Sequence, residues 1–348
     1  MRRLPALLLV LCVVAGALTG CAPGSTSEHG PIALLLPDKK TARYETFDRP
    51  IFEARVAELG DYDVLYANAD QGAARQQQQA ESALAAGAEV LVLDPVDARA
   101  AATIVASAAA QDVPVIAYDR LISGGGLAYY ISFDNERVGE LQAAALVTAL
   151  AERGQKAAGI LMVNGSPTDS NAAHFRAGAR RIIDESGLRV LAEYDTPDWS
   201  PDKAQSWVAG QISQYGADIA GVYAANDGTA SGAVAALRAA DVSPFPVVTG
   251  QDAELSALQR IVAGDQYMTV YKALKPQAQR AAEVAVDLLH GRPVTGEIEV
   301  DGTPATLLTP VAVTAADILD TVVADGFWTV EDICTPDYAA ACAAAGIQ

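Results

Sequence analysis

The chain has 348 residues, of which 51% are hydrophobic and 6% aromatic, and its formal charge is −19 at pH 7. This length suffices for two domains, and the hydrophobic content is typical of packed α/β layers and excludes a disordered chain. The negative charge and the lack of a basic recognition helix exclude a nucleic-acid partner, because phosphate binding needs a basic face.

Residues 1–30 have the pattern of an export signal followed by a tether. The cationic start Met1–Arg3 precedes an apolar run, 4–18, that is too short to favour a spanning helix. The run ends in Leu-Thr-Gly-Cys21, which resembles the lipobox of bacterial lipoproteins. The resemblance implies a signal peptide 1–20, lipidation of the Cys21 thiol and anchoring to the membrane. The alternative is an ordinary secreted protein whose signal ends in cysteine. Residues 21–30 are predicted to be a flexible tether.

Strand and helix patterns alternate from residue 31 onward. Continuous apolar runs, typical of buried parallel strands, alternate with helically spaced segments. This β-α-β-α-β-α-β order predicts a doubly wound parallel sheet. The expected strands are 31–36, 63–67, 89–93 and 115–118, with a further strand that ends at 133, and the expected helices are 47–59, 73–86 and 98–110.

The pattern begins again at Glu136 and predicts a second lobe of the same α/β class. Two similar halves of this kind suggest a clamshell with a cleft between them. Ser200 and Pro201 have the sequence of a helix start, with serine as the N-cap. The expected helices are 138–151, 171–186, 201–215, 228–240, 255–263, 275–290 and 315–325, and the expected strands are 159–163, 189–194, 219–224, 247–250, 267–271 and 306–313.

The stretch 113–137 is the most informative part of the chain. An apolar strand, 115–118, leads directly into the adjacent acid and base Asp119 and Arg120, and a three-glycine turn follows at 124–126. Polar groups at the carboxyl end of a strand in an α/β sheet point into the crevice where such folds bind ligands. The alternative is a surface Asp–Arg pair at a strand end.

Polar or aromatic side chains recur at the ends of the predicted strands. Carboxylates accept hydrogen bonds from hydroxyls, cations and amides donate to them, and aromatic faces cover C–H groups, so such a set suits a sugar. Any one of these residues could instead be a helix cap or a surface polar residue. The strand-end residues are Arg43, Tyr44, Asp119, Arg120, Asp169, Asn171, Trp199, Asn226, Asp227, Gln251, Asp252 and Lys272.

Motifs for catalysis and cofactor binding are missing. The sequence contains no G-x-G-x-x-G, no G-x-x-x-x-G-K-[ST] and no G-x-S-x-G. His29, His174 and His290 are far apart in sequence and are expected to be surface or helix residues, so no metal cluster is predicted. We therefore expect a protein that is not an enzyme and needs no cofactor or metal.

Two cysteines remain beyond the export signal and Cys21. Cys334 and Cys342 lie near the carboxyl end, and in an oxidising, exported setting we expect them to form a disulfide. A metal site is not expected there, because no histidine accompanies them. The tail 331–348 is assigned a structural role only.

The chain resembles the periplasmic pentose and hexose binding proteins of bacterial ABC transporters, and most of all those that bind D-xylose. The resemblance runs from about Ile32 to about Phe327, and the tail lies outside it. The family's fold, periplasmic binding protein type I, has two Rossmann-like lobes joined by a three-segment hinge, and sugar binding closes them. The blocks that carry the resemblance are AYDRLI (117–122), YYISFDNERVGELQA (129–143), GSPTDSNAAHFRAG (165–178), AANDGTASGA (224–233), GQDAEL (250–255), MTVYK (268–272) and LLTP (307–310).

The resemblance implies the division into lobes and the ligand-binding residues. The N-terminal lobe would be 31–134 plus 272–305, and the C-terminal lobe 135–271 plus 306–330. Tyr44 stands where the xylose proteins usually have Trp, and the loop around Trp199 also departs from the family, which leaves the exact sugar open. The residues implied to bind the ligand are Arg43, Tyr44, Asp119, Arg120, Asp169, Asn171, Trp199, Asn226, Asp252 and Lys272.

The sequence thus predicts a monomeric, lipid-anchored, extracytoplasmic protein that binds a monosaccharide and delivers it to the membrane permease of an ABC importer. Xylose is the favoured ligand, with glucose or another aldose as the alternative. A protein that presents its closed form to a chemoreceptor or sensor kinase would have the same sequence features. An enzyme acting on sugars would need an acid/base or metal constellation, and the ligand domain of a cytoplasmic repressor would not carry an export signal.

Overall fold

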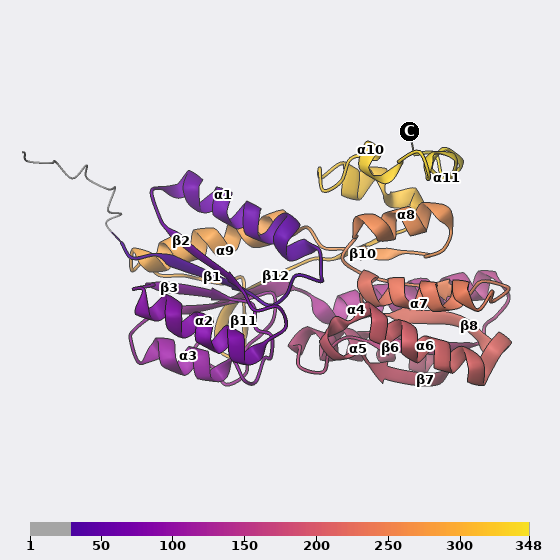
Figure 1. Ribbon diagram of the computed structural model, residues 1–348, viewed down its shortest axis with the longest axis horizontal. Coiled ribbons are helices and arrows are strands. Elements are labelled where there is room, and N and C mark those ends of the chain that lie inside the picture. Colours follow the sequence, from indigo (N-terminus) through magenta and orange to yellow (C-terminus); the bar gives the residue numbers. More distant parts are fainter. Residues whose placement is uncertain (1–28, 348) are drawn as a thin grey trace, which may run out of the picture.

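A computed structural model describes residues 29–347 and shows two lobes side by side, each built around a sheet (Figure 1). The predicted signal peptide, Cys21 and nearly all of the tether lie outside the described residues. Within 29–347, no helix has the length and apolar character needed to cross a membrane.

The N-terminal lobe contains a seven-stranded sheet in the order β11-β12-β5-β4-β3-β1-β2. All pairings are parallel except that of the edge strand β11. The strand β1 is buried along its whole length, as its continuous apolar sequence predicts. The strands are β1 (Ile32–Leu36), β2 (Val64–Asn68), β3 (Val90–Leu93), β4 (Val115–Tyr118), β5 (Tyr129–Phe133), β11 (Ile298–Val300) and β12 (Thr303–Leu308).

Helices cover both faces of this sheet. The helices α1 (Arg49–Leu59) and α9 (Leu274–Leu289) pack on one face, and α2 (Ala73–Ala85) and α3 (Ala102–Ala109) pack on the other. The α9 helix enters the lobe from the distant carboxyl-terminal part of the chain, and its alanines lie against the apolar residues of β1, β3 and β4. A π-helical turn, η1 (Tyr44–Asp48), precedes α1.

The C-terminal lobe contains a four-stranded parallel sheet in the order β7-β6-β8-β9. Its helices α4 (Asn135–Glu152) and α5 (Ser170–Ser186) pack on one face, and α6 (Pro201–Tyr215) and α7 (Asp227–Ala239) pack on the other. The strands are β6 (Gly159–Asn164), β7 (Arg189–Asp195), β8 (Ile219–Ala224) and β9 (Val247–Val248).

A smaller layer lies above this sheet in Figure 1. It contains the helix α8 (Leu255–Ala263) and the antiparallel pair β10 (Thr269–Tyr271) and β13 (Val311–Val313). The segment beyond β13 covers α8 with the short helices α10 (Val330–Ile333) and α11 (Ala339–Ala344), and Cys334 and Cys342 form a disulfide within it.

The chain crosses between the lobes at 134–135, 272–273 and 309–310. The last crossing corrects the predicted boundary at 305/306, because β12 pairs with β5 of the N-terminal lobe as far as Leu308. The predicted strand 306–313 is therefore two strands, one in each lobe, separated by Thr309 and Pro310. Proline at 310 has no N–H to give to a ladder, which suits a break at this place.

Four other helix predictions differ from the structure. The helix predicted at 138–151 begins at Asn135. The predicted helix 315–325 consists of a 3₁₀ turn, η4 (Ala315–Asp317), and a π turn, η5 (Leu319–Val323). The helix predicted at 47–59 starts with the π turn η1, which begins at Tyr44, and its α-helical part begins only at Arg49. The helix predicted at 98–110 begins at Ala102.

The contact between α4 and α5 depends on two glycines. A Cβ at Gly139 would lie 1.9 Å from the backbone oxygen of Phe175, and a Cβ at Gly178 would lie 1.9 Å from that of Glu136. We expect Gly139→Ala to lower the free energy of unfolding by about 2 kcal/mol, because the helices must separate.

Gly210→Ala in α6 is the matched control for this prediction, measured by urea denaturation. A Cβ there has nothing within 4 Å, so the substitution should stabilise the chain by about 0.5–1 kcal/mol through helix propensity. Equal effects of the two substitutions would contradict the tight α4–α5 contact.

Candidate ligand-binding site

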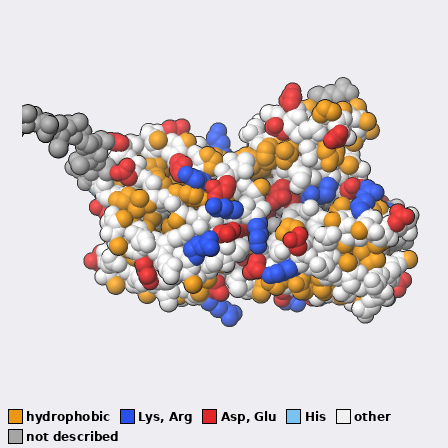
Figure 2. Space-filling view, viewed as in Figure 1, with side chains coloured by type: hydrophobic (Ala, Val, Ile, Leu, Met, Phe, Trp, Pro, Cys, Tyr) orange, Lys and Arg blue, Asp and Glu red, His pale blue; other side chains and the backbone are white. Residues whose placement is uncertain are grey.

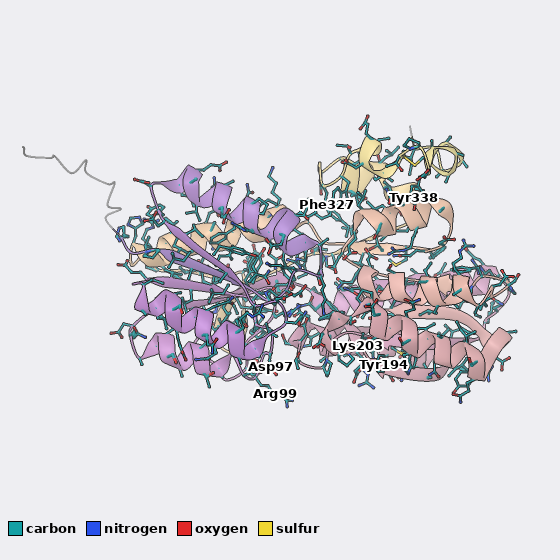
Figure 3. All side chains as sticks on the ribbon, in the orientation of Figure 1. Asp97, Arg99, Tyr194, Lys203, Phe327 and Tyr338 are labelled. Atoms are coloured by element: carbon teal, nitrogen blue, oxygen red, sulfur yellow. A yellow bond between two sulfur atoms is a disulfide. The ribbon has the colours of Figure 1, made fainter. Side chains whose placement is uncertain are left out.

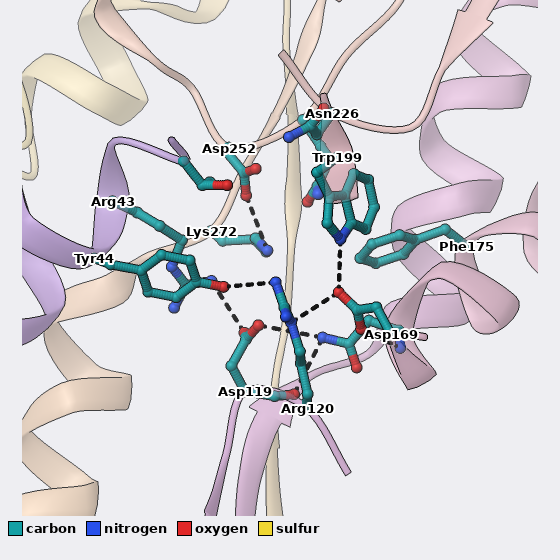
Figure 4. Close-up of a pocket in the computed structure, with 13 residues that line it drawn as sticks. Arg43, Tyr44, Asp119, Arg120, Asp169, Phe175, Trp199, Asn226, Asp252 and Lys272 are labelled. Carbon is teal, nitrogen blue, oxygen red and sulfur yellow. Dashed lines mark hydrogen bonds and ion pairs between the residues drawn. The ribbon is translucent and has the colours of Figure 1, made fainter. Parts of the chain in front are cut away.

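A cavity lies at the junction of the two lobes (Figure 4). Every side chain that lines it is buried. Lys and Arg side chains also gather at the outer surface of this junction, beside acidic ones, on the face shown in Figure 2. The cavity contains all ten residues that the sequence predicts to bind a ligand, and it adds three others. Its lining consists of Thr41, Arg43, Tyr44, Asp119, Arg120, Asp169, Asn171, Phe175, Trp199, Asn226, Gln251, Asp252 and Lys272.

Arg43 is held by protein groups on most of its donor positions. Its Nε and Nη2 donate to the two carboxylate oxygens of Asp48, both at 2.8 Å. Nη1 donates to Oδ1 of Asp119 at 3.0 Å, and Nη2 also donates to Oε1 of Gln277 at 2.8 Å. Gln277 Nε2 in turn donates to the same oxygen of Asp119 at 3.2 Å. Arg43 therefore orients the Asp119 carboxylate and is not chiefly a ligand donor.

Arg120 joins the two lobes. Its Nε lies 2.8 Å from Oδ2 of Asp169, which belongs to the C-terminal lobe. Its other nitrogens donate within the N-terminal lobe, to the carbonyl oxygen of Pro95 and to the hydroxyl of Tyr44, both at 3.1 Å. The Asn171 amide also crosses the junction and donates to the backbone oxygen of Asp119 at 3.1 Å. The lobes are thus closed on each other at the floor of the cavity.

Two of the cavity residues are helix caps as well. The Oδ1 of Asp169 accepts from the Asn171 N–H at 2.8 Å at the start of α5, while its Oδ2 faces Arg120 and accepts from Nε1 of Trp199 at 3.0 Å. The Oδ1 of Asn226 accepts from the Thr229 N–H at 2.8 Å at the start of α7. Asp169 and Asn226 are therefore both helix caps and cavity residues, so both interpretations that the sequence left open are correct for them.

Lys272 and Asp252 form the third ion pair of the cavity. The Nζ of Lys272 lies 2.9 Å from Oδ1 of Asp252 and faces the rings of Phe133 and Phe175 at 5.6 and 5.9 Å. Since Lys272 lies in the second crossing and Asp252 in the C-terminal lobe, this pair connects the hinge to the cavity wall.

Strained backbone marks three cavity residues. The φ angles of Asp119, Trp199 and Asp252 are 61°, 54° and 102°, in the region that L residues rarely adopt. Aspartate tolerates this region better than a bulky tryptophan does. Strain of this kind persists where surrounding contacts enforce it, and it gathers at functional sites.

Burial and neighbouring charges act in opposite directions on the acids of the site. Burial by itself would raise the pKa of Asp119, but Arg43, Lys272 and Arg120 outweigh it, so its pKa lies well below the usual range. Burial raises the pKa of Asp94 and of Asp169, although Arg120 offsets part of the effect. Asp119 therefore remains ionised.

The formal charges of the lining cancel. Asp119, Asp169 and Asp252 oppose Arg43, Arg120 and Lys272 among the residues that line the cavity. A charged ligand would leave one charge uncompensated in a buried place, at a cost of several kcal/mol. The aromatic rings of Tyr44, Phe175 and Trp199 offer apolar faces beside these polar groups. This lining suits a small neutral molecule with many hydroxyl groups and some C–H surface.

The sequence analysis missed several residues that the structure brings to the site. Asp94 directly ends a predicted strand, as Asp119 does, so the same signal was available for it; its carboxylate lies 3.4 Å from Nε of Arg120. Gln251 was not missed, because it is one of the strand-end residues that the sequence analysis names, although it is not among the ten that the family resemblance implies; within the described residues its side-chain oxygen has no hydrogen-bond partner. Asp48, Phe175 and Gln277 lie on helices, where nothing in the sequence pattern distinguishes them from structural residues.

Comparisons with known proteins point to one family. The family model described as "Periplasmic binding protein domain" matches residues 32–293. The D-xylose-binding periplasmic protein of Haemophilus influenzae is 36% identical over 332 residues, which cover 93% of this chain and 98% of that protein. The protein of the same name from Escherichia coli is 35% identical over 304 residues, covering 85% of this chain and 90% of that protein.

Solved structures extend this similarity to the fold. An ABC transporter solute binding protein from Clostridium phytofermentans, determined with bound β-D-glucose, superposes with a TM-score of 0.79 at 27% identity. The match covers 87% of this chain and 99% of that one, so it includes both lobes.

The low pKa of Asp119 predicts a pH-dependent contribution to stability. An acid whose pKa is lower in the folded than in the unfolded chain stabilises the fold above its unfolded pKa of about 3.9, and this stabilisation is lost as the pH falls toward the folded pKa. We expect Asp119→Asn to lower the free energy of unfolding by about 3 kcal/mol at pH 7, because Arg43 loses a buried partner.

Urea denaturation of both proteins at pH 7, 5 and 3.5 measures this contribution. The difference between the wild type and Asp119→Asn should be the same at pH 7 and 5 and smaller at pH 3.5. A difference that is independent of pH over this range would show that the charge of Asp119 does not stabilise the fold.

Proposed function

This chain belongs to the periplasmic binding protein domain family, and on that premise we propose that it captures a neutral monosaccharide outside the cytoplasm and delivers it to the permease of an ABC importer. It has the type I fold of this family, with two doubly wound lobes joined by three crossings. The family is one of binding proteins, not of enzymes.

The observation that carries the proposal is the buried cavity between the lobes, whose three acids and three bases cancel in charge. Every lining side chain is buried, and an enclosed site suits a single sugar ring better than an oligosaccharide, which would extend beyond it. Charge-assisted hydrogen bonds contribute about 1.5–3 kcal/mol each, so a few of them support micromolar binding.

Different lining groups have different roles in this proposal. Asn226 uses its oxygen to cap α7, which leaves its amide N–H groups as donors to a sugar hydroxyl. Gln251 offers a buried side-chain oxygen as an acceptor. Trp199 and Phe175 face each other at 6.3 Å between ring centres in an edge arrangement and offer apolar surface to C–H groups. Arg43 acts through the carboxylate that it orients.

Closure is the mechanistic step that the geometry supports. A sugar that contacts Asp119 from one lobe and Asn226 from the other gains contacts in the closed conformation that it lacks in the open one, so binding raises the closed population. The permease would then recognise the closed form.

We propose D-xylose as the ligand, because the matches to the two D-xylose-binding periplasmic proteins cover 98% and 90% of those proteins. D-glucose is the second candidate, since the solved structure with a TM-score of 0.79 was determined with it. A hexose needs room for one further hydroxymethyl group, so the dimensions of the cavity decide between them.

Calorimetric titration with D-xylose, D-glucose, L-arabinose, D-ribose and D-galactose tests the proposal. We expect D-xylose to bind the wild type and Asn226→Ser to weaken that binding at least tenfold, or by about 1.4 kcal/mol. Serine keeps the N-cap of α7 but removes the amide donor.

Glu297→Gln is the control for this titration, because Glu297 is exposed and does not line the cavity. It should bind as the wild type does. If none of the five sugars bound to the wild type, the monosaccharide proposal would be wrong, and if Asn226→Ser bound D-xylose normally, the assigned role of Asn226 would be wrong.

We also propose that Cys21 carries the lipid anchor. The proposal rests on the lipobox-like sequence that ends at this cysteine. In cells fed with a labelled fatty acid, we expect the label on the wild-type chain and the chain in the membrane fraction. Cys21→Ser should carry no label, and incorporation of label into Cys21→Ser would contradict the assignment.

A further inference from the structure

Three aromatic side chains join the lobes outside the ligand cavity. Phe47 of the N-terminal lobe stacks on Phe327 with 4.0 Å between ring centres and 14° between planes, and Trp328 meets Phe47 edge-on at 5.1 Å. Phe327 also packs against Tyr271 of β10 at 5.2 Å. Figure 3 labels Phe327 on the side of the carboxyl-terminal segment that faces α1. None of the three lines the cavity.

The position of Phe47 is tied to the cavity through η1. This π turn contains Tyr44, which accepts from Arg120, and Asp48, which holds two nitrogens of Arg43. Tyr44 and Asp48 are buried in their own lobe, while Phe47 contacts the other lobe. A π turn is wider than an α-helical turn and occurs mostly as a single turn at functional sites. Here the π turn lets the segment Tyr44–Asp48 contact both the cavity and the opposite lobe.

On the C-terminal-lobe side of the contact, Trp328 is linked to the cavity by a hydrogen bond to Ala253, the neighbour of Asp252. Its Nε1 donates to the backbone oxygen of Ala253 at 3.0 Å. Ala253 and the neighbouring Asp252 have φ angles of 49° and 102°, so this segment needs support from its surroundings.

The disulfide-bonded segment that follows Trp328 packs into the same apolar cluster as Phe327 and Trp328. Ile333, Cys342 and Ile347 are buried in the cluster that contains Phe327 and the apolar side of α8. The side chain of Gln259 on α8 donates to the backbone oxygen of Asp332 at 3.2 Å. The bond between Cys334 and Cys342 restricts the conformations of the chain between them and so favours the packed arrangement.

We propose that Phe47, Phe327 and Trp328 form an interlobe latch that stabilises the closed conformation and positions Asp252 for the ligand. The halves of the latch belong to different lobes, so an opening that moves η1 away from the carboxyl-terminal segment would break the contact. Any contact made only in the closed conformation raises the closed population and lowers the dissociation constant of a ligand that binds this form. The effect on affinity rests on the proposed sugar-binding function, whereas the effect on closure does not.

Phe47→Ala tests the N-terminal half of the latch, with Phe245→Ala as the matched control. Phe245 is also partly buried, but it packs within the C-terminal lobe, with Arg238 over its ring at 4.8 Å. In stopped-flow fluorescence with D-xylose, we expect Phe47→Ala to raise the dissociation constant about tenfold, mainly through faster release. Phe245→Ala should change it less than twofold. Phe47→Tyr keeps the ring and should restore most of the affinity. Equal affinity of Phe47→Ala and the wild type would overturn the latch.

Trp328→Phe tests the connection to Asp252. The substitution keeps an aromatic ring beside Phe47 and removes the donor to Ala253. We expect a several-fold higher dissociation constant for D-xylose than in the wild type. An unchanged dissociation constant would overturn the positioning of Asp252 by Trp328.

Small-angle X-ray scattering without sugar separates the latch from the proposed function. The ligand-free Phe47→Ala chain should have a larger radius of gyration than ligand-free Phe245→Ala, because its lobes separate more often. Equal radii would overturn the latch whatever the ligand is. If D-xylose failed to bind to the wild type while the radii still differed, the xylose assignment would be wrong and the latch would stand.

Discussion

Arg120 is the charge on which the closed molecule depends. Its guanidinium is buried and lies 2.8 Å from Asp169 of the opposite lobe. A buried cation without a carboxylate costs several kcal/mol. Asp94 and Asp38 of its own lobe are farther away, at 3.4 and 3.9 Å. The approach of Asp169 when the lobes meet therefore supplies the close partner that the N-terminal lobe alone does not.

The other two ion pairs of the cavity extend the same principle. Arg43 holds Asp119 in place, with Asp48 and Gln277 as its further partners, and Lys272 in the hinge holds Asp252. These contacts fix the directions of the polar groups in the cavity before a ligand arrives. A pre-oriented site loses less conformational entropy on binding, which favours affinity for a small neutral molecule.

The backbone of the site adopts positive φ angles that the surrounding contacts must maintain. Trp199 adopts a positive φ that a bulky residue avoids when free, and its indole N–H donates to Asp169. Asp252 and Ala253 are strained as well, and Trp328 supports them from outside the cavity. The ligand site and the interlobe latch are thus two parts of one arrangement. The cavity provides specific polar contacts, and the aromatic contact outside it favours closure for any ligand that fits.

The sequence by itself determined the α/β class, most of the strands and the ten predicted cavity residues. Buried parallel strands are continuous apolar runs, and the polar residues that follow them must gather at one edge of the sheet. These are local patterns, and a single chain displays them directly. The resemblance to a family added D-xylose as the favoured ligand, the three-segment hinge and the bounds of the two lobes.

Only the tertiary structure decided which residues support the site. Arg43 and Gln277 are 234 residues apart in sequence, and they meet because α9 returns to the N-terminal lobe. The boundary predicted at 305/306 was wrong because a run such as 306–313 has no local sign of which sheet each end joins; pairing with β5 decided it. Phe47 and Phe327 likewise have no local sign of their contact. Their contact depends on how the lobes close, and closure is a property of the whole chain.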